Sequence, residues 1–148
     1  MKRINSMSLV GKESLIAAGE ENDCTVYAVA TAFGMEYDAA HKEVADRMKR
    51  QEGEGVSRKN ILEALEEGTV LNGKTVTRVI KTPTKVYKVY GNTVPRQIRL
   101  SSFVKDYPEG TYLILTRGHA LTLKDGVLMD NRKQTKARAL VTVAIKVD

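Results

Sequence analysis

The first half of the chain has the hydrophobic spacing of helices. Residues 24–33 are apolar or small almost all the way round, which is typical of a helix at the centre of a fold. Asn22 and Asp23 supply N-cap side chains directly before this segment, and Gly34 follows it as a C′ glycine would. The sequence therefore predicts a buried helix with Cys24 in its first turn.

Two more helices are expected after this one. Residues 37–50 are amphipathic, with Tyr37, Ala40, Val44 and Met48 on the apolar side. Residues 51–56 contain two glycines and are predicted to form a loop. Ser57 then has the position of an N-cap for a third helix that extends to residue 67. Its inward side chains would be Ile61, Leu62 and Leu65.

The second half of the chain is rich in β-branched and aromatic residues, which favour strands. Residues 74–80 and 85–90 are β-branched and aromatic runs on either side of Pro83, whereas residues 91–99 show no clear pattern. Residues 101–107 favour a short helix that ends at a Pro-Glu-Gly turn. Helices followed by strands indicate an α+β fold, and 148 residues fit a single domain spanning residues 1–148.

The strongest strand pattern lies near the C-terminus. Strands are predicted at residues 111–117, 119–124 and 127–131, and a closing strand at residues 139–147. If Gly118 introduces no bulge, alternation places His119 on the same face as Leu113 and Leu121. That face is the more apolar one, so we expect it to lie against the helices.

The turn at Asp125-Gly126 fixes a register for the last hairpin. A two-residue turn makes Lys124 face Val127, so the numbers of opposed residues sum to 251. Asp130 then lies on the face of His119 and diagonal to it, at a backbone distance of about 7–8 Å. Asn131 lies on the opposite face, and a turn one residue longer would exchange the two.

These residues can be combined into a nucleophilic site. A thiol in the first turn of a helix meets the positive end of the helix dipole and free N–H groups, which stabilise a thiolate and can bind an oxyanion. With Cys24 as nucleophile, His119 as base and Asp130 as orienting acid, the logic of a Cys-His-acid triad is complete. The alternative is that Cys24 and His119 are ordinary core residues. His41 lies among charged residues and is expected to be solvated.

Residues 22–30 resemble the nucleophile helix of small papain-like cysteine peptidases, particularly the compact versions of phages and bacteria. Residues 108–113 and 118–131 are similar to the histidine hairpin of that family. The resemblance implies N-terminal helices packed on a C-terminal antiparallel sheet, with Cys24, His119 and Asp130 in the roles given above. Many members carry an oxyanion-hole glutamine before the cysteine. Here the nearest amide is Asn22, either an oxyanion donor or the N-cap.

Composition and terminal sequence bear on where in the cell the protein is expected. The single cysteine excludes an intrachain disulfide, and the chain has neither a long apolar run nor a secretory signal, so we expect a cytoplasmic protein without membrane contact. The net charge is +6, from 24 Lys and Arg against 18 Asp and Glu. The basic residues 132–138 follow Asp130 and would attract acidic substrates or a nucleic-acid backbone, or simply be a solvated connection.

The expected function is hydrolysis of a peptide or isopeptide bond in a protein or peptide substrate, with no metal and no cofactor. Acyl transfer and glutamine deamidation would use the same residues, and the sequence does not choose among them. The alternative from another class is a non-catalytic phage or bacterial protein of the same fold. It would hold a protein or nucleic-acid partner through its basic surface. The oligomeric state is not indicated.

Overall fold

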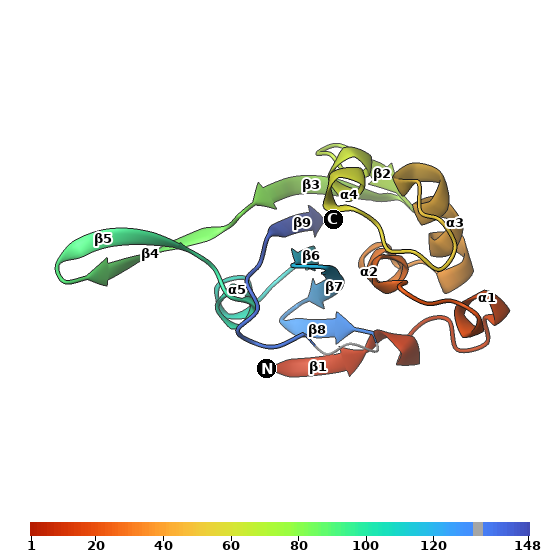
Figure 1. Ribbon diagram of the computed structural model, residues 1–148, viewed down its shortest axis with the longest axis horizontal. Coiled ribbons are helices and arrows are strands. Elements are labelled where there is room, and N and C mark those ends of the chain that lie inside the picture. Colours follow the sequence, from red (N-terminus) through yellow and green to blue (C-terminus); the bar gives the residue numbers. More distant parts are fainter. Residues whose placement is uncertain (132–134) are drawn as a thin grey trace.

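The structure is a computed structural model that describes residues 1–131 and 135–148, and it has an α+β architecture (Figure 1). Its helices are η1 (Ser6–Ser8), α1 (Leu15–Ala18), α2 (Cys24–Phe33), α3 (Tyr37–Met48), α4 (Arg58–Ala64) and α5 (Leu100–Asp106). Its strands are β1 (Lys2–Asn5), β2 (Val70–Leu71), β3 (Lys74–Lys81), β4 (Thr84–Val89), β5 (Asn92–Gln97), β6 (Thr111–Thr116), β7 (His119–Lys124), β8 (Val127–Asp130) and β9 (Val143–Val147). None of the helices in these described ranges has the length and apolar character needed to cross a membrane.

Seven strands form the main sheet, in the order β1-β8-β7-β6-β9-β3-β2. Neighbouring strands are antiparallel except β1 and β8, which run parallel. Strands β4 and β5 pair only with each other and extend away from the rest of the molecule (Figure 1). The expected antiparallel sheet is therefore present, with one parallel edge strand from the N-terminus added to it.

Helices cover both faces of the sheet, and each face has its own core. Helix α2 packs on one face against β6 and β7, and α3 packs against α2. The core on this face includes Leu113, Leu115 and Ala120, together with the inward residues of β9. Helix α5 packs on the other face, where Phe103 meets Leu121, Leu123 and further apolar side chains of the sheet. This burial of apolar surface on both sides supplies the main driving force for the fold.

Helix α2 is the central element, and its bounds confirm the prediction for residues 24–33. It is buried nearly all round and ends at Gly34, whose φ of 67° is the left-handed conformation that glycine adopts without steric cost. Threonine hydrogen bonds also link it to β7. The Thr122 hydroxyl donates to the Ala28 carbonyl at 2.9 Å, and the Thr31 hydroxyl donates to the Thr122 hydroxyl at 2.8 Å. These bonds attach α2 to β7 at one defined position.

The third helix is shorter than expected. The Ser57 hydroxyl caps α4 by accepting from the Asn60 N–H at 3.2 Å, as predicted, but the helix stops at Ala64 instead of residue 67. The physical reason lies in the next segment, where the Gly68 N–H donates to the Val76 carbonyl at 2.8 Å. Residues after Ala64 thus leave the helix in order to join β3.

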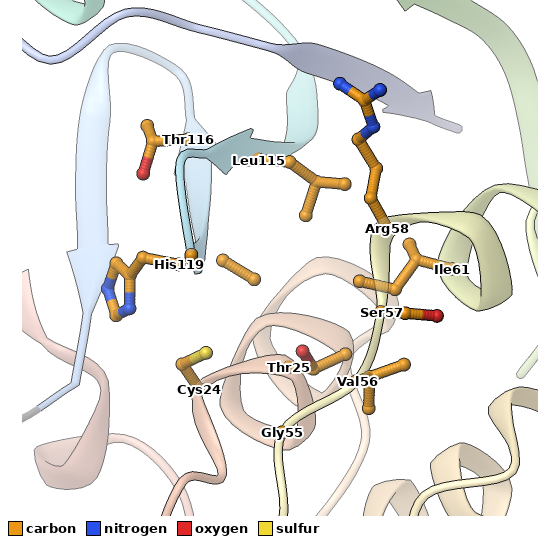
Figure 2. A pocket seen from close by; sticks show the side chains of 12 residues that line it. Cys24, Thr25, Gly55, Val56, Ser57, Arg58, Ile61, Leu115, Thr116 and His119 are labelled. Carbon is orange, nitrogen blue, oxygen red and sulfur yellow. The ribbon is translucent and has the colours of Figure 1, made fainter.

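The expectation that His119 lies on the face against the central helix is wrong. Residues 117 and 118 are not part of one long strand but form a two-residue turn between β6 and β7, with Gly118 at a φ of 71°. The turn reverses the chain, so Leu121 packs on the α5 face whereas Leu113 packs on the α2 face. Alternation within β7 gives His119 the parity of Leu121. The His119 side chain nevertheless lies beside Cys24, because His119 begins β7 at the edge of the sheet where α2 starts (Figure 2).

The register predicted for the last hairpin is confirmed. Lys124 pairs with Val127, Leu123 with Leu128 and Thr122 with Met129, so each pair sums to 251. Continued along the strand, this register places Asp130 on the face of His119, as the two-residue turn requires.

Candidate active site

Cys24 is the first residue of α2 and is partly buried. Asp23 has the N-cap position, but among the described residues its side chain makes no capping hydrogen bond. Its carboxylate instead accepts from the Tyr37 hydroxyl at 2.7 Å. The prediction that Asn22 and Asp23 cap the helix through their side chains is therefore wrong. The backbone N–H groups of the first turn, which have no intrahelical partner, are left without a side-chain cap beside the thiol.

His119 and Asp130 form a buried pair. His119 Nε2 lies 2.5 Å from Asp130 Oδ1, and the residues are 8% and 5% exposed. Two further hydrogen bonds fix the orientation of the carboxylate. Oδ1 also accepts from the Asn131 N–H at 3.0 Å, and Oδ2 accepts from the Thr135 N–H at 2.9 Å. With Nε2 committed to Asp130, Nδ1 is the imidazole nitrogen that remains for another partner.

That partner is Cys24. The thiol and the imidazole lie close enough for each to shift the pKa of the other, and Figure 2 shows the two side chains next to each other at the start of α2 and of β7. The structure thus brings Cys24, His119 and Asp130 together in one line of contacts. Thiol, imidazole and carboxylate come from three separate elements, α2, β7 and β8.

The electrostatics of the three groups favour a charged pair. Burial opposes ionisation of Cys24, but the hydrogen bond from His119, the Ala120 backbone and the charge of His119 bring the pKa of the thiol below its ordinary value. Burial would also lower the pKa of His119, yet the bonds to Asp130 and Cys24 raise it to about 9. The pKa of Asp130 is lowered despite burial, mainly by its bond to His119. The opposite directions of the two shifts stabilise a thiolate beside an imidazolium relative to the isolated groups.

The thiol and the imidazole open onto a pocket of about 330 Å³ (Figure 2). Its far wall comes from the loop before α4 and from the start of that helix, with Val56 and Ile61 as apolar lining and Arg58 at the rim. A second pocket of about 310 Å³ lies where Cys24 and His119 meet Asn22 and Asn131. Cys24 and His119 therefore have accessible space on two sides.

A buried ion pair holds the pocket wall in place. Glu20 lies four residues before Cys24 and accepts from Arg50 Nη1 at 2.8 Å and from the Gly53 N–H at 2.7 Å. The same Arg50 donates to the Glu21 carbonyl at 3.0 Å. Its hydrogen bond is the largest reason that the pKa of Glu20 falls to about 2. These bonds attach the loop of residues 51–56 to the segment that leads into α2.

His41 belongs to this cluster and not to solvent. Its Nε2 atom lies 2.7 Å from Glu20 Oε2, and the side chain is mostly buried. The expectation of a solvated His41 is therefore wrong. The charged residues around it in sequence lie on the outer side of α3, whereas Glu20 reaches it from a different part of the chain.

Asn22 has a role that the sequence did not indicate. Its backbone has a φ of 51°, and its side-chain Nδ2 donates to the Gly53 carbonyl at 3.0 Å. Asn22 therefore precedes the N-cap and holds the loop, while its side of the site forms part of the second pocket with Cys24. Its role as an oxyanion donor stays a prediction.

Other supporting residues were also missed. Thr135 orients Asp130, and its carbonyl accepts from Arg3 Nη2 at 2.5 Å, so the N-terminal strand supports the acid of the site. Arg50 supports the wall through Glu20, 30 residues away in sequence. No local pattern of residue types connects these partners, so no signal in the sequence could have identified them.

Of the basic segment 132–138, residues 132–134 lie outside the described residues. Lys136 and Arg138 are exposed and line a third pocket of about 620 Å³ that also touches His119 and Arg117. In the part of the chain that the structure describes, no group of three or more His, Cys, Asp or Glu side chains is placed to hold a metal ion.

Comparison with protein-family models, with curated proteins and with solved structures gives no match to this chain. The chemistry of the site therefore has to be argued from its own geometry.

Proposed function

We propose that the protein is a cysteine-dependent acyl hydrolase of papain-like arrangement that cleaves a peptide or isopeptide bond. The observation that carries this proposal is the line of contacts from the Cys24 thiol through His119 to the buried Asp130, set at the start of α2 beside an open pocket. Structural cysteines and core histidines rarely have a buried acid on one side and accessible space on the other. A reducing compartment suits the proposal, because Cys24 must stay a free thiol.

In the first half of the reaction, the Cys24 thiolate attacks the carbonyl carbon, a C–S bond forms, and the carbonyl electron pair moves to oxygen. Backbone N–H groups at the start of α2, with the Asn22 amide as a further candidate, would bind that oxyanion. The oxyanion then collapses, the C–N bond breaks, and the His119 imidazolium donates its proton to the leaving nitrogen. The product of this half is a thioester on Cys24 and a free amine.

In the second half, His119 removes a proton from water, which attacks the thioester carbonyl. The C–S bond breaks, the acid is released, and the proton on His119 accompanies the restored thiolate. Asp130 takes up no proton in either half. It holds the imidazole by Nε2, fixes which nitrogen faces the thiol, and stabilises the imidazolium.

The test uses the fact that Cys24 is the single cysteine of the chain. Alkylation by iodoacetamide at pH 6, followed by mass spectrometry of the intact protein, reports on this thiol alone. We expect a rate at least tenfold above that of a free peptide thiol, because His119 lowers the pKa of the thiol and so raises its thiolate fraction. His119→Ala should remove the acceleration. A wild-type rate equal to that of a free thiol, or slower, would contradict the proposal.

Acyl transfer and glutamine deamidation begin with the same attack and differ from peptide hydrolysis in the acyl acceptor or in the leaving group. An added amine that appears in the product would identify a transferase, and release of ammonia from a glutamine side chain would identify a deamidase. Cys24→Ala should abolish all three reactions, since each needs the covalent intermediate.

A further inference from the structure

Within residues 1–131 and 135–148, the hairpin of β4 and β5, here called the arm (residues 84–97), pairs with itself and has no packing partner over most of its length. Its six residue pairs are internal, from Thr84 with Gln97 to Val89 with Asn92. Nearly all of its residues are exposed or only partly buried. An isolated two-stranded hairpin is marginally stable in water, so an extended arm of this kind gains from a partner (Figure 1).

The charge of the chain is concentrated around this arm. Residues 68–105 contain eight Lys and Arg and no Asp or Glu, so this segment carries +8. The other residues hold sixteen cations against eighteen acids, which gives −2. The net charge of +6 is therefore not a general property of the surface. It belongs to the arm and its two flanks, which points to a polyanionic partner.

The cations of this segment are largely free. Among the described residues, Lys81, Lys88, Arg96 and Arg99 make no ion pair, whereas Lys85 pairs with Asp106 at 3.3 Å. Lys85 and Arg96 are directly opposite each other in the hairpin. Like charges in such a pair destabilise a hairpin, and an anion bound between them would relieve the repulsion.

Aromatic side chains are interleaved with these charges. Tyr87 shares a face with Lys85 and Arg96, and Tyr90 at the tip is 99% exposed. Tyr90 has a φ of 49° and Gly91 a φ of 78°, a turn in which Asn, Asp or Gly is the usual first residue. A bulky tyrosine is unfavourable there. A fully exposed tyrosine at this unfavourable position is explained if its ring stacks on a planar group of a binding partner.

We propose that the arm binds nucleic acid, with the free cations of the arm and its two flanks on the phosphates and its tyrosines against the bases. Cations alone would fit any polyanion, but exposed aromatic rings between them are the pattern of nucleic-acid surfaces. A two-stranded ribbon also has the width that a duplex major groove admits. A second copy of the chain is disfavoured as the partner, because two segments of charge +8 repel. This inference is independent of the catalytic proposal.

The test is fluorescence anisotropy of the full chain with a labelled 20-base-pair duplex and, separately, with one of its strands. Four free cations predict a slope of log K against log salt of about −3 to −4, from about −0.7 to −0.9 per phosphate contacted. Affinity should therefore fall roughly 50- to 150-fold between 50 and 200 mM salt. The two probes distinguish groove binding from binding of single strands. No binding of either probe at 50 mM salt would overturn the proposal.

Matched variants locate the site. Lys88→Gln with Arg96→Gln should weaken binding at least tenfold, whereas Lys42→Gln with Lys59→Gln, an equal change of charge on α3 and α4, should change it less than about threefold. Equal losses in both double variants would refute a role for the arm.

Tyr90→Asn separates recognition from folding, since asparagine suits the turn better than tyrosine and cannot stack. We expect it to leave the thermal midpoint unchanged or higher and to weaken binding of the single strand by about tenfold. Poly-glutamate is the competing probe. If it loses affinity with the arm variants as DNA does and Tyr90→Asn affects neither, the arm is a site for acidic proteins and the nucleic-acid proposal is wrong.

Discussion

Asp130→Ala is the change that tests the site most directly. It removes the carboxylate that lies 2.5 Å from His119 Nε2 and leaves a buried imidazole with no acid to stabilise its charge. Burial alone lowers the pKa of His119, and only the bonds to Asp130 and Cys24 raise it to about 9. In the variant the pKa of His119 should therefore fall well below that of the wild type, and the pKa of Cys24 should rise because its cationic partner is lost.

The magnitude can be worked from the same values. A rise of the His119 pKa from 6.5 to about 9 corresponds to about 3 kcal/mol of stabilisation of the imidazolium. Breaking one side of a buried ion pair typically costs about 3–5 kcal/mol. If Asp130 supplies most of this stabilisation, turnover should fall by a factor on the order of 10² or more, in line with the loss of a triad acid.

The assay is the rate of Cys24 alkylation by iodoacetamide from pH 5 to pH 9. Wild type should react rapidly already at pH 6, whereas Asp130→Ala should follow the rising profile of an ordinary thiol. Asp130→Asn is a second variant that keeps the shape of the side chain and one of its two acceptor oxygens, enough for the N–H of either Asn131 or Thr135, so it disturbs the fold less than Asp130→Ala while it removes the charge. Asn131→Ala is the matched control. An unchanged profile in both Asp130 variants, or a larger effect in Asn131→Ala, would refute the assignment.

Three further predictions concern the supports of the site. Glu20 has a pKa of about 2 against 4.5, so it stabilises the fold above pH 4.5 by up to about 3 kcal/mol and loses this contribution as the pH falls toward 2. Glu20→Gln should thus lower urea stability at pH 7, with a difference from wild type that shrinks at pH 3. Asn22→Ala should reduce kcat on the order of 10² with little change in KM if the amide binds the oxyanion, which steady-state kinetics on an identified substrate will measure. Gly118→Ala should lower the thermal midpoint by several degrees, because a Cβ at a φ of 71° costs about 1 kcal/mol in the turn before His119.

The parts of the fold that the sequence predicted are those with strong local rules. Helix α2 needed only an apolar run that ends at Gly34, and its bounds were predicted to the residue. The last hairpin needed only the turn at Asp125-Gly126, whose two positive φ values fit a two-residue connection. Because that register was correct, the choice of Asp130 over Asn131 as the partner of His119 was correct as well.

The parts that failed depend on partners distant in sequence. Residue 117 was interpreted as the end of a strand and Gly118 as a possible break in it, because nothing local distinguishes a chain-reversing turn at a single glycine from a break in a strand that continues. The predicted face of His119 was therefore wrong. Glu20 contacts Arg50 and Gly53 because α3 packs back on α2, and these partners lie about 30 residues away in sequence. β1 has only four residues and no alternation of hydrophobic and polar positions, so nothing in the sequence indicated its parallel pairing with β8.

The threonine bonds between α2 and β7 have a consequence for the accuracy of the site. Apolar contacts hold a helix on a sheet but resist sliding only weakly, since they have no direction. The bond from Thr122 to the Ala28 carbonyl does have direction, and it lies three residues after His119 on one element and four after Cys24 on the other. This bond fixes the position of α2 along the direction of β7. Replacing Thr122 by the similarly shaped valine should keep the two layers together but let Cys24 and His119 shift relative to each other. If they act as the proposed nucleophile and base, a shift of about 1 Å is enough to cost about two orders of magnitude in rate.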